Sequence, residues 1–254
     1  MTRTCAVLAG LLVCGPAAMP ARALNFFELE VYPATTEGKG LHELENITSF
    51  VANGRRPSEE EAAGEEPRRH RLLRTTLEYD YGLTDKIDVA AYLDLQRPNG
   101  EELEYAQSRF RARGAFFEKG RFPLDVGWYI EAEMPDRGES KLELEFRPIV
   151  SRDIGRFSVD LNPMLELPTV TSERRTLEFD YGARVYYRLS RDLVPGVEFF
   201  VPALYGRLAR GVKFVVGPGF GLTRASDPVI LRIGVEYEFT LPAGGGGGPP
   251  RPTY

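Results

Sequence analysis

The chain has 254 residues, of which 43% are hydrophobic and 27% are charged, and its formal net charge is −5. An acidic chain without a basic stripe is not expected to bind nucleic acid, because phosphate binding requires clustered Lys and Arg side chains. The sequence contains no stretch of about 18 apolar residues, which excludes a helical membrane protein.

The N-terminal residues have the features of a secretory signal peptide. A positive start at Met1–Arg3 precedes an apolar run at Cys5–Gly15 and an A-x-A sequence at Ala21–Ala23. This order predicts cleavage near Ala23, so that residues 1–23 are removed on export. An uncleaved N-terminal anchor helix is the alternative. Both cysteines of the chain precede the cleavage site, so the mature protein is expected to have neither disulfides nor thiol catalysis.

Segments of alternating apolar and polar residues follow, separated by turn-forming residues. They span residues 25–33, 41–51, 71–82, 86–96, 103–117, 122–134, 141–150, 156–167, 175–189, 194–205, 211–222 and 228–241. Segments of roughly 10 residues are long enough to cross a bilayer at a tilt, and single-chain bacterial barrels use an even number of strands. The sequence therefore predicts an all-β fold, a single antiparallel transmembrane β-barrel of about 12 strands in up-and-down order, over residues 24–242.

The last segment shows the alternation most clearly. Apolar side chains at every second position from Val229 to Leu241 share one face, and charged side chains share the other. Such a strand is expected to face lipid on one side and a wet lumen on the other. It also resembles the C-terminal signal read by the outer-membrane insertion machinery, through Arg232, Gly234, Tyr237 and Phe239. Residues 243–254 are rich in Gly and Pro and are expected to be a disordered tail.

The connections differ in character along the chain. Residues 52–69 carry a charged cluster without apolar side chains, which predicts a mobile loop, with partner binding as the alternative. Others, such as Gly82–Lys86, are tight polar turns. If the strands are counted back from a periplasmic C-terminus, these tight turns lie outside the cell. That conflicts with the usual arrangement, in which periplasmic turns are the shorter ones.

Several short motifs resemble a family of transporters in Gram-negative outer membranes that is related to the MetA pathway of phenol degradation. The likeness covers most of the mature chain and rests on Glu43-Leu44-Glu45, Tyr81–Lys86, Arg147–Ser151 followed by Asn162-Pro163, Gly217-Pro218 and Phe220–Thr223. The resemblance implies a barrel in the outer membrane and says little about cargo.

The inward face of the predicted barrel carries the candidate pore lining. Its sharpest feature is an arginine ladder, Arg109, Arg111 and Arg113, opposite further inward side chains at Tyr129, Glu131, Glu133, Glu143, Glu145 and Arg147. Pairing across the turn near Gly120 predicts Arg109 beside Glu131 and Arg111 beside Tyr129, and the next connection brings Glu131 near Glu145 and Glu133 near Glu143. The ladder and the acidic wall either create a transverse field across a pore or neutralise each other and brace a narrow barrel.

These features predict a narrow channel or uptake porin for small polar or cationic solutes, because acids outnumber bases on the inward face. The alternative is a closed structural or adhesive barrel that acts through its loops. The expected partners are outer-membrane lipid and the insertion machinery. No cofactor or metal site is expected, and enzyme activity is not expected, because the chain has only His42 and His70 and neither belongs to a catalytic constellation.

Overall fold

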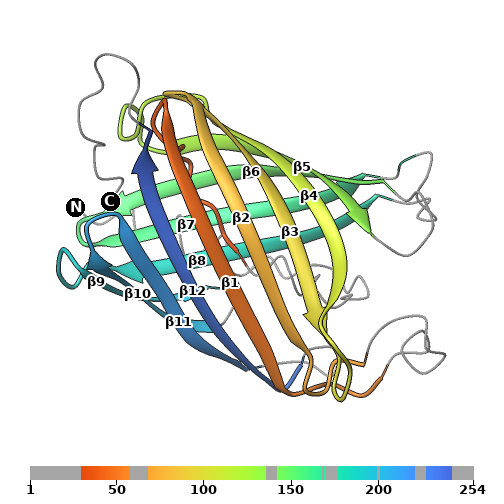
Figure 1. Cartoon of the computed structure of the whole chain (residues 1–254). Helices are drawn as coiled ribbons and strands as arrows, with labels where there is room; N and C mark the ends of the chain where they lie inside the picture. The colour runs from red at the N-terminus through yellow and green to blue at the C-terminus, as the bar shows by residue number, and fades with distance from the viewer. Residues whose placement is uncertain are drawn as a thin grey trace.

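The computed structural model (Figure 1) describes residues 30–57, 68–135, 142–167, 169, 177–198, 201–220 and 227–241. The predicted signal peptide at residues 1–23 and the predicted tail at residues 243–254 lie outside these ranges. Within the described residues, no helix is long and apolar enough to cross a membrane.

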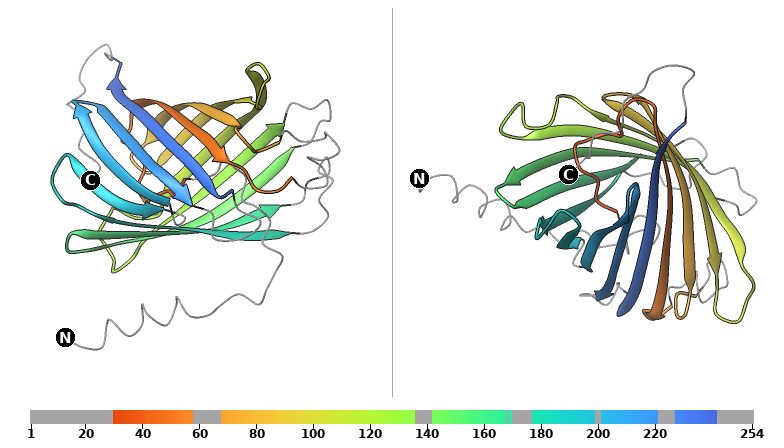
Figure 2. Two further views of the ribbon diagram at one scale, coloured as in Figure 1. Left: turned by 90° about the horizontal axis from the view of Figure 1, so that it is seen from below. Right: turned by 60° about the vertical axis from the view of Figure 1, so that its left-hand side comes forward.

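The described residues form twelve β-strands. Their bounds are β1 (Leu41–Asn53), β2 (Leu73–Thr84), β3 (Ile87–Arg97), β4 (Glu104–Ala115), β5 (Asp125–Pro135), β6 (Glu143–Ile154), β7 (Phe157–Leu167), β8 (Glu178–Tyr187), β9 (Leu193–Glu198), β10 (Val201–Ala209), β11 (Val212–Phe220) and β12 (Val229–Thr240). Each strand pairs antiparallel with the next, and β12 pairs with β1, so the sheet closes into a barrel (Figures 1 and 2). The predicted all-β, up-and-down barrel is confirmed.

The barrel is apolar outside and charged inside. Along β12, Leu231, Ile233 and Val235 are 49%, 53% and 43% exposed, whereas Arg232 between them is buried. The same alternation places Leu77 and Tyr79 of β2 outside and the acids between and after them inside. A strand with this pattern separates two solvents, and its apolar side matches lipid.

Two of the predicted strands are wrong, and their errors cancel in the count. The described part of segment 25–33 is not a strand, because residues 30–33 continue as irregular chain toward Gly38. Segment 194–205 instead contains both β9 and β10. The face that points inward changes across residues 199–200, since Glu198 and Ala203 are both buried. Between Glu198 and Arg207 the sequence has no charged residue to mark that change.

The division of segment 194–205 resolves the conflict over turn lengths. The five connections at the end of the barrel where β12 ends are residues 85–86, 116–124, 155–156, 188–192 and 210–211, and all but 116–124 are short. The connections at residues 54–72, 98–103, 136–142, 168–177, 199–200 and 221–228 lie at the opposite end, and all but 199–200 are longer than five residues. A barrel whose C-terminal strand ends in the periplasm therefore has most of its tight turns on the periplasmic side, as bacterial barrels usually do.

The connection between β1 and β2 is the predicted mobile loop. Its residues 58–67 lie outside the described ranges. The two described ends of the loop meet at one carboxylate: the backbone N–H of Arg55 and the Arg69 guanidinium both donate to Asp227, each at 3.0 Å. The loop is thereby fixed at its base to the residues that lead into β12.

Candidate functional site in the barrel lumen

The arginine ladder of β4 lies inside the barrel and is buried. Arg109 donates from Nε to Asp94 Oδ2 at 2.7 Å and from Nη1 to Glu131 Oε1 at 3.2 Å. The predicted strand register is wrong by two residues, since Arg109 is opposite Glu133 and Arg111 is opposite Glu131. The contact between Arg109 and Glu131 forms nevertheless, because a long side chain reaches a diagonal neighbour on the same face.

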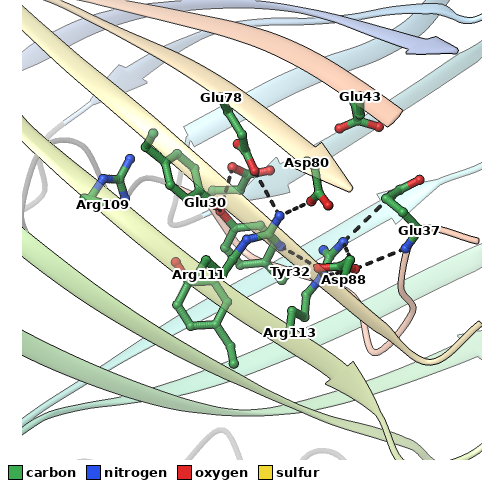
Figure 3. Close-up of polar contacts among 12 residues, drawn as sticks. Glu30, Tyr32, Glu37, Glu43, Glu78, Asp80, Asp88, Arg109, Arg111 and Arg113 are labelled. Atoms are coloured by element: carbon green, nitrogen blue, oxygen red, sulfur yellow. Dashed lines mark hydrogen bonds and ion pairs between the residues drawn. The ribbon is translucent and has the colours of Figure 1, made fainter. Parts of the chain in front are cut away.

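The other two arginines bind the acids of β2 and β3 (Figure 3). Arg111 donates to Glu78 at 3.0 Å and to Asp80, and its Nη1 lies 3.3 Å from Asp88. Arg113 donates from Nη2 to Asp88 at 2.8 Å. Each guanidinium therefore has carboxylate partners on neighbouring strands, which is the arrangement a buried charge requires.

The remaining candidate pore-lining residues lie on β5 and β6. Tyr129 donates its hydroxyl to Glu131 at 2.5 Å, and Arg147 pairs with Glu145. The predicted pairs of neighbours are present in the strand register, Glu131 with Glu145 and Glu133 with Glu143. All these residues share the inward face, and together with β2–β4 they form a braced wall. Their role in lining a conducting pore remains a prediction.

A stretch of irregular chain, residues 30–38, runs inside the barrel along this wall (Figure 3); we call it the luminal segment. Its main chain is bound by inward side chains. The N–H of Val31 donates to Glu198, the N–H of Tyr32 donates to Asn162 Oδ1 at 2.6 Å, and Asn162 Nδ2 donates back to the Tyr32 carbonyl at 2.9 Å. Sequence analysis missed this element because its alternating residues imitate a strand.

Further along the luminal segment, the wall of β3 and β6 continues the contacts. The N–H of Ala34 donates to Ser151 Oγ at 2.8 Å, and the N–H of Glu37 donates to Asp88 Oδ2 at 3.1 Å. A Cβ placed on Gly127 of β5 would lie 2.7 Å from the carbonyl of its neighbour Gly114 and 3.4 Å from the Cα of Ala34. The wall therefore has no side chain at Gly127, where the luminal segment crosses it at Ala34.

The side chain of Tyr32 is the main anchor of the luminal segment. Its ring lies 5.0 Å from the ring of Tyr129. The guanidinium carbons of Arg111 and Arg113 each lie 5.2 Å from the Tyr32 ring centre, and that of Arg147 lies 5.9 Å away. Cation–π contacts of this kind strengthen when water is excluded. Tyr32, Ala34, Tyr129 and Ile149 form a small apolar core inside the otherwise charged lumen.

The luminal segment enters the barrel at the end with the short turns. Gly38 and Gly40 reverse the chain between the segment and β1: the N–H of Leu41 donates to the Gly38 carbonyl at 2.9 Å, and Gly40 has a φ of 76°. The N–H of Gly40 donates to the carbonyl of Gly82 at 2.8 Å. A Cβ on Gly82 would lie 2.0 Å from the Gly38 carbonyl oxygen, so glycine is required at this close approach.

A cavity of about 190 Å³ remains between the luminal segment and the opposite wall. Its lining residues are mostly charged. The acidic ones are Glu30, Glu37, Glu43, Glu45, Glu78, Asp80, Asp192, Glu198 and Glu236, and the basic ones are Arg111, Arg113, Arg184, Arg191, Arg207, Lys213 and Arg232. The acids exceed the bases, and the contributions of Asp192, Arg191 and Arg207 place the cavity toward the end with the short turns.

Two groups of three carboxylates occur among the described residues. They are Glu30, Glu45 and Glu78, and Glu37, Glu43 and Glu238, and within each group the oxygens lie within 4.8 Å of one another. Carboxylate oxygens are the ligands that Ca²⁺ and Mg²⁺ prefer. The second group already has a cationic neighbour, because the Lys213 ammonium pairs with Glu238 and lies 3.9 Å from Glu43.

Glu37 lies outside the strands, at the end of the luminal segment. Burial raises the pKa of its carboxyl to about 7, although Arg113 lies 3.8 Å away and opposes this shift. Its ionisation therefore falls within the physiological pH range, unlike that of an exposed glutamate.

The predicted insertion signal occupies both faces of β12. Arg232 points inward and donates to Glu198 at 3.1 Å, and Gly234 is buried. Tyr237 points outward, and the ring of Phe239 lies 5.5 Å from it and 5.3 Å from the ring of His42. Such an aromatic cluster at the barrel end matches the girdles that flank the apolar band. The role of these residues in insertion remains a prediction.

Neither histidine has catalytic partners among the described residues. His42 shares a 2.6 Å hydrogen bond with the hydroxyl of Tyr79 on the outer face. His70 lies in the connection between β1 and β2, where its Nδ1 is 3.5 Å from the N–H of Gly54.

The closed sheet, its apolar outer face and its charged interior define an outer-membrane type of β-barrel. No protein-family model and no curated protein matches the sequence. The resemblance to the transporter family related to the MetA pathway therefore remains a prediction.

Solved structures of outer-membrane barrels are similar to the chain in fold. A Salmonella typhi outer membrane phospholipase dimer with bound calcium is 13% identical, with 85% of this chain and 94% of that chain covered and a TM-score of 0.44. An Acinetobacter baumannii outer membrane protein is 7% identical, with 83% and 100% covered and a TM-score of 0.45. The Ralstonia pickettii toluene transporter is 9% identical, with 80% and 90% covered and a TM-score of 0.38. At these values the likeness concerns the fold alone.

One sequence prediction is corrected by these comparisons. The absence of a histidine-based catalytic constellation was the basis for predicting that the chain is not an enzyme. That exclusion is wrong, because the matched barrels include outer membrane phospholipase A, which is an enzyme.

Proposed function

We propose that this chain is an outer-membrane β-barrel that passes small polar solutes, with a preference for cations, through a lumen that the luminal segment narrows. The observation that supports this proposal is the polar cavity beside the segment. A barrel that served only as a membrane anchor would need no such water-accessible, charge-lined space. The apolar outer face and the aromatic cluster beside β12 support insertion into lipid.

The charge of the cavity supports the preference for cations. Its acids exceed its bases, and several of the acids gather in the group formed by Glu30, Glu45 and Glu78. A confined space of one charge sign concentrates ions of the opposite sign. The family resemblance and the C-terminal signal favour a transporter that is inserted by the outer-membrane machinery, and both belong to this proposal.

A closed structural barrel is the second candidate, and a specific observation favours it. Each arginine of the ladder forms ion pairs with acids, and the luminal segment lies against the wall. In this alternative the charges brace the wall, and the loops opposite the short turns carry the function.

Planar-bilayer recording separates the two candidates. The purified full-length protein, its fold verified by circular dichroism and by heat-dependent gel mobility, is expected to show small open levels, with a reversal potential in a KCl gradient that favours K⁺. Glu45→Gln is expected to reduce this preference, whereas Glu118→Gln in the exposed turn before β5 is the matched control and leaves it unchanged. Absence of any conductance from the folded protein overturns the channel and favours the closed barrel.

A further inference from the structure

The lumen wall recognises the main chain of the luminal segment. Side chains from four separate strands make these contacts, namely Glu198 of β9, Asn162 of β7, Ser151 of β6 and Asp88 of β3. They bond to backbone N–H groups, and Asn162 also bonds to a backbone carbonyl. Because every peptide carries these groups, such contacts recognise an extended chain, as an added strand is recognised at a sheet edge.

One side-chain pocket adds selectivity to these backbone contacts. The Tyr32 ring lies against Tyr129 and next to the guanidinium groups of Arg111, Arg113 and Arg147. Two residues later the chain carries a small side chain, because Ala34 is only 3% exposed and packs in the apolar core formed with Tyr32, Tyr129 and Ile149. The wall therefore accepts an extended peptide with an aromatic anchor followed, two positions on, by a small residue.

The mode of attachment differs from that of the strands. Each strand of the barrel is paired with two neighbouring strands, whereas the backbone N–H groups of Tyr32, Ala34 and Glu37 in the luminal segment donate to separate side chains. It joins β1 directly through the turn at Gly38–Gly40. A short tether keeps such a segment at a high effective concentration, so weak contacts are enough to hold it in place.

From these contacts we infer that the lumen wall of β3–β9 is a binding site for an extended peptide, and that the luminal segment, residues 30–38, is its tethered and exchangeable ligand. Release of the segment widens the lumen without breaking any strand pairing. An effect of this widening on conduction rests on the proposed channel function. The peptide site does not depend on conduction.

The test uses a variant in which the luminal segment binds the wall more weakly and the wall residues are unchanged. Tyr32→Ala in the full-length protein removes the aromatic anchor. A fluorescent peptide with the sequence of residues 30–38 is then titrated into the purified variant in detergent, with anisotropy as the readout. Saturable binding is expected to the Tyr32→Ala variant, and binding at least tenfold weaker is expected to wild type, whose site is occupied.

Site variants identify where the peptide binds. Combining Tyr32→Ala with Asn162→Ala is expected to weaken peptide binding at least tenfold. The matched control combines Tyr32→Ala with Gln107→Ala, since the buried amide of Gln107 donates to Asp94 at 3.0 Å instead of to the luminal segment. Equal binding by the Asn162 and Gln107 combinations, or no binding to the folded Tyr32→Ala protein, overturns the inference.

A second measurement covers the case in which Tyr32→Ala does not fold. Ala34→Cys introduces a single cysteine into the described part of the chain. Because position 34 is buried, labelling of this thiol by a water-soluble maleimide is expected to be slow. Adding Asn162→Ala is expected to raise the labelling rate at least tenfold, and an unchanged rate overturns the inference. Neither readout measures current, so a folded protein that binds peptide but does not conduct contradicts only the proposed channel.

Discussion

The side-chain amide of Asn162 forms two hydrogen bonds with one distant residue, accepting from the backbone N–H of Tyr32 at 2.6 Å and donating to its carbonyl at 2.9 Å. An amide carries both a donor and an acceptor, so one Asn satisfies both polar groups of the Tyr32 backbone. A buried backbone group without a partner is costly. This pair therefore explains how an irregular chain is held inside a barrel without a strand pairing of its own.

The ion pairs of Arg109 are expected to make a large contribution to stability. Arg109→Leu leaves Asp94 and Glu131 buried without their cation, and removal of one partner of a buried pair typically costs about 3–5 kcal/mol. Urea unfolding measures this loss in the free energy of unfolding. Arg97→Leu at the exposed end of β3 serves as the control and is expected to change it by less than about 0.5 kcal/mol. Equal losses in the two variants would contradict the bracing role.

The outer face is expected to be sensitive to charge according to depth. Val235→Arg places a cation on the apolar side of β12, where a charge near the bilayer midplane costs about 2–4 kcal/mol. Leu241→Arg, just beyond the end of the same strand, is expected to cost about 0–1 kcal/mol. Equilibrium unfolding from lipid vesicles gives both values. Similar costs at the two positions would argue against a membrane-spanning β12.

The luminal segment is expected to be held more tightly in acid than in base. The pKa of Glu37 is raised by burial to about 7, so the docked state favours the protonated carboxyl. The stabilisation that Glu37 gives to the docked segment is complete below pH 4.5, the ordinary pKa of a glutamate carboxyl, and is lost as the pH rises through about 7. A pKa unit corresponds to about 1.4 kcal/mol, so the undocked population is expected to rise at least tenfold between pH 5 and pH 8.

Spin-label mobility measures this dependence. A nitroxide attached through Thr35→Cys reports docking, and Glu37→Gln is expected to remove the contribution of Glu37 to the pH profile. The charged groups that act on the Glu37 carboxyl include Arg113, Lys213, Asp80 and Glu236, and the carboxylate oxygens of Glu43 and Glu238 lie within 4.8 Å of it. Identical profiles for the wild-type and Glu37→Gln backgrounds would exclude Glu37 as the titrating group.

The orientation of the barrel is expected to follow its turn lengths. Asn99→Cys lies in a connection opposite the end of β12, and Lys86→Cys lies in a short turn beside that end. A membrane-impermeant thiol reagent is expected to label the cysteine at position 99 in intact cells and the one at position 86 only after the outer membrane is permeabilised. The reverse pattern would place the C-terminal strand end outside the cell.

Period-two alternation predicted most of the fold because each strand separates two different solvents. The apolar side chains of Leu231 and Ile233 predict the outer face of β12, and the charged Arg232 predicts the inner face. The structure has all three on the predicted faces. The method failed where that contrast is missing. Residues 199–206 carry no charge to show that the inward face changes between β9 and β10, so alternation alone predicts one strand where the structure has two.

The luminal segment was missed for the opposite reason. Val31 and Tyr32 are adjacent in sequence, yet both are buried, because the segment is surrounded by the barrel wall instead of separating two solvents. Pro33, which lacks a donor for a sheet ladder, and the glycines at 38 and 40 were the available signals. The partners of the arginine ladder depended on the strand register, and the sequence does not determine how many residues the turn near Gly120 uses.

The turn at Gly38–Gly40 places a pivot at one rim of the barrel. Gly40 has the positive φ that glycine adopts without strain, and a Cβ on Gly38 would meet no atom within 4 Å. In the proposed exchange, the luminal segment leaves the wall but stays attached at this point, while β1 keeps its pairing with β2 and β12. This turn lies beside the short turns, so the released segment stays tethered at the rim where β12 ends, and the loops at the opposite end need not move.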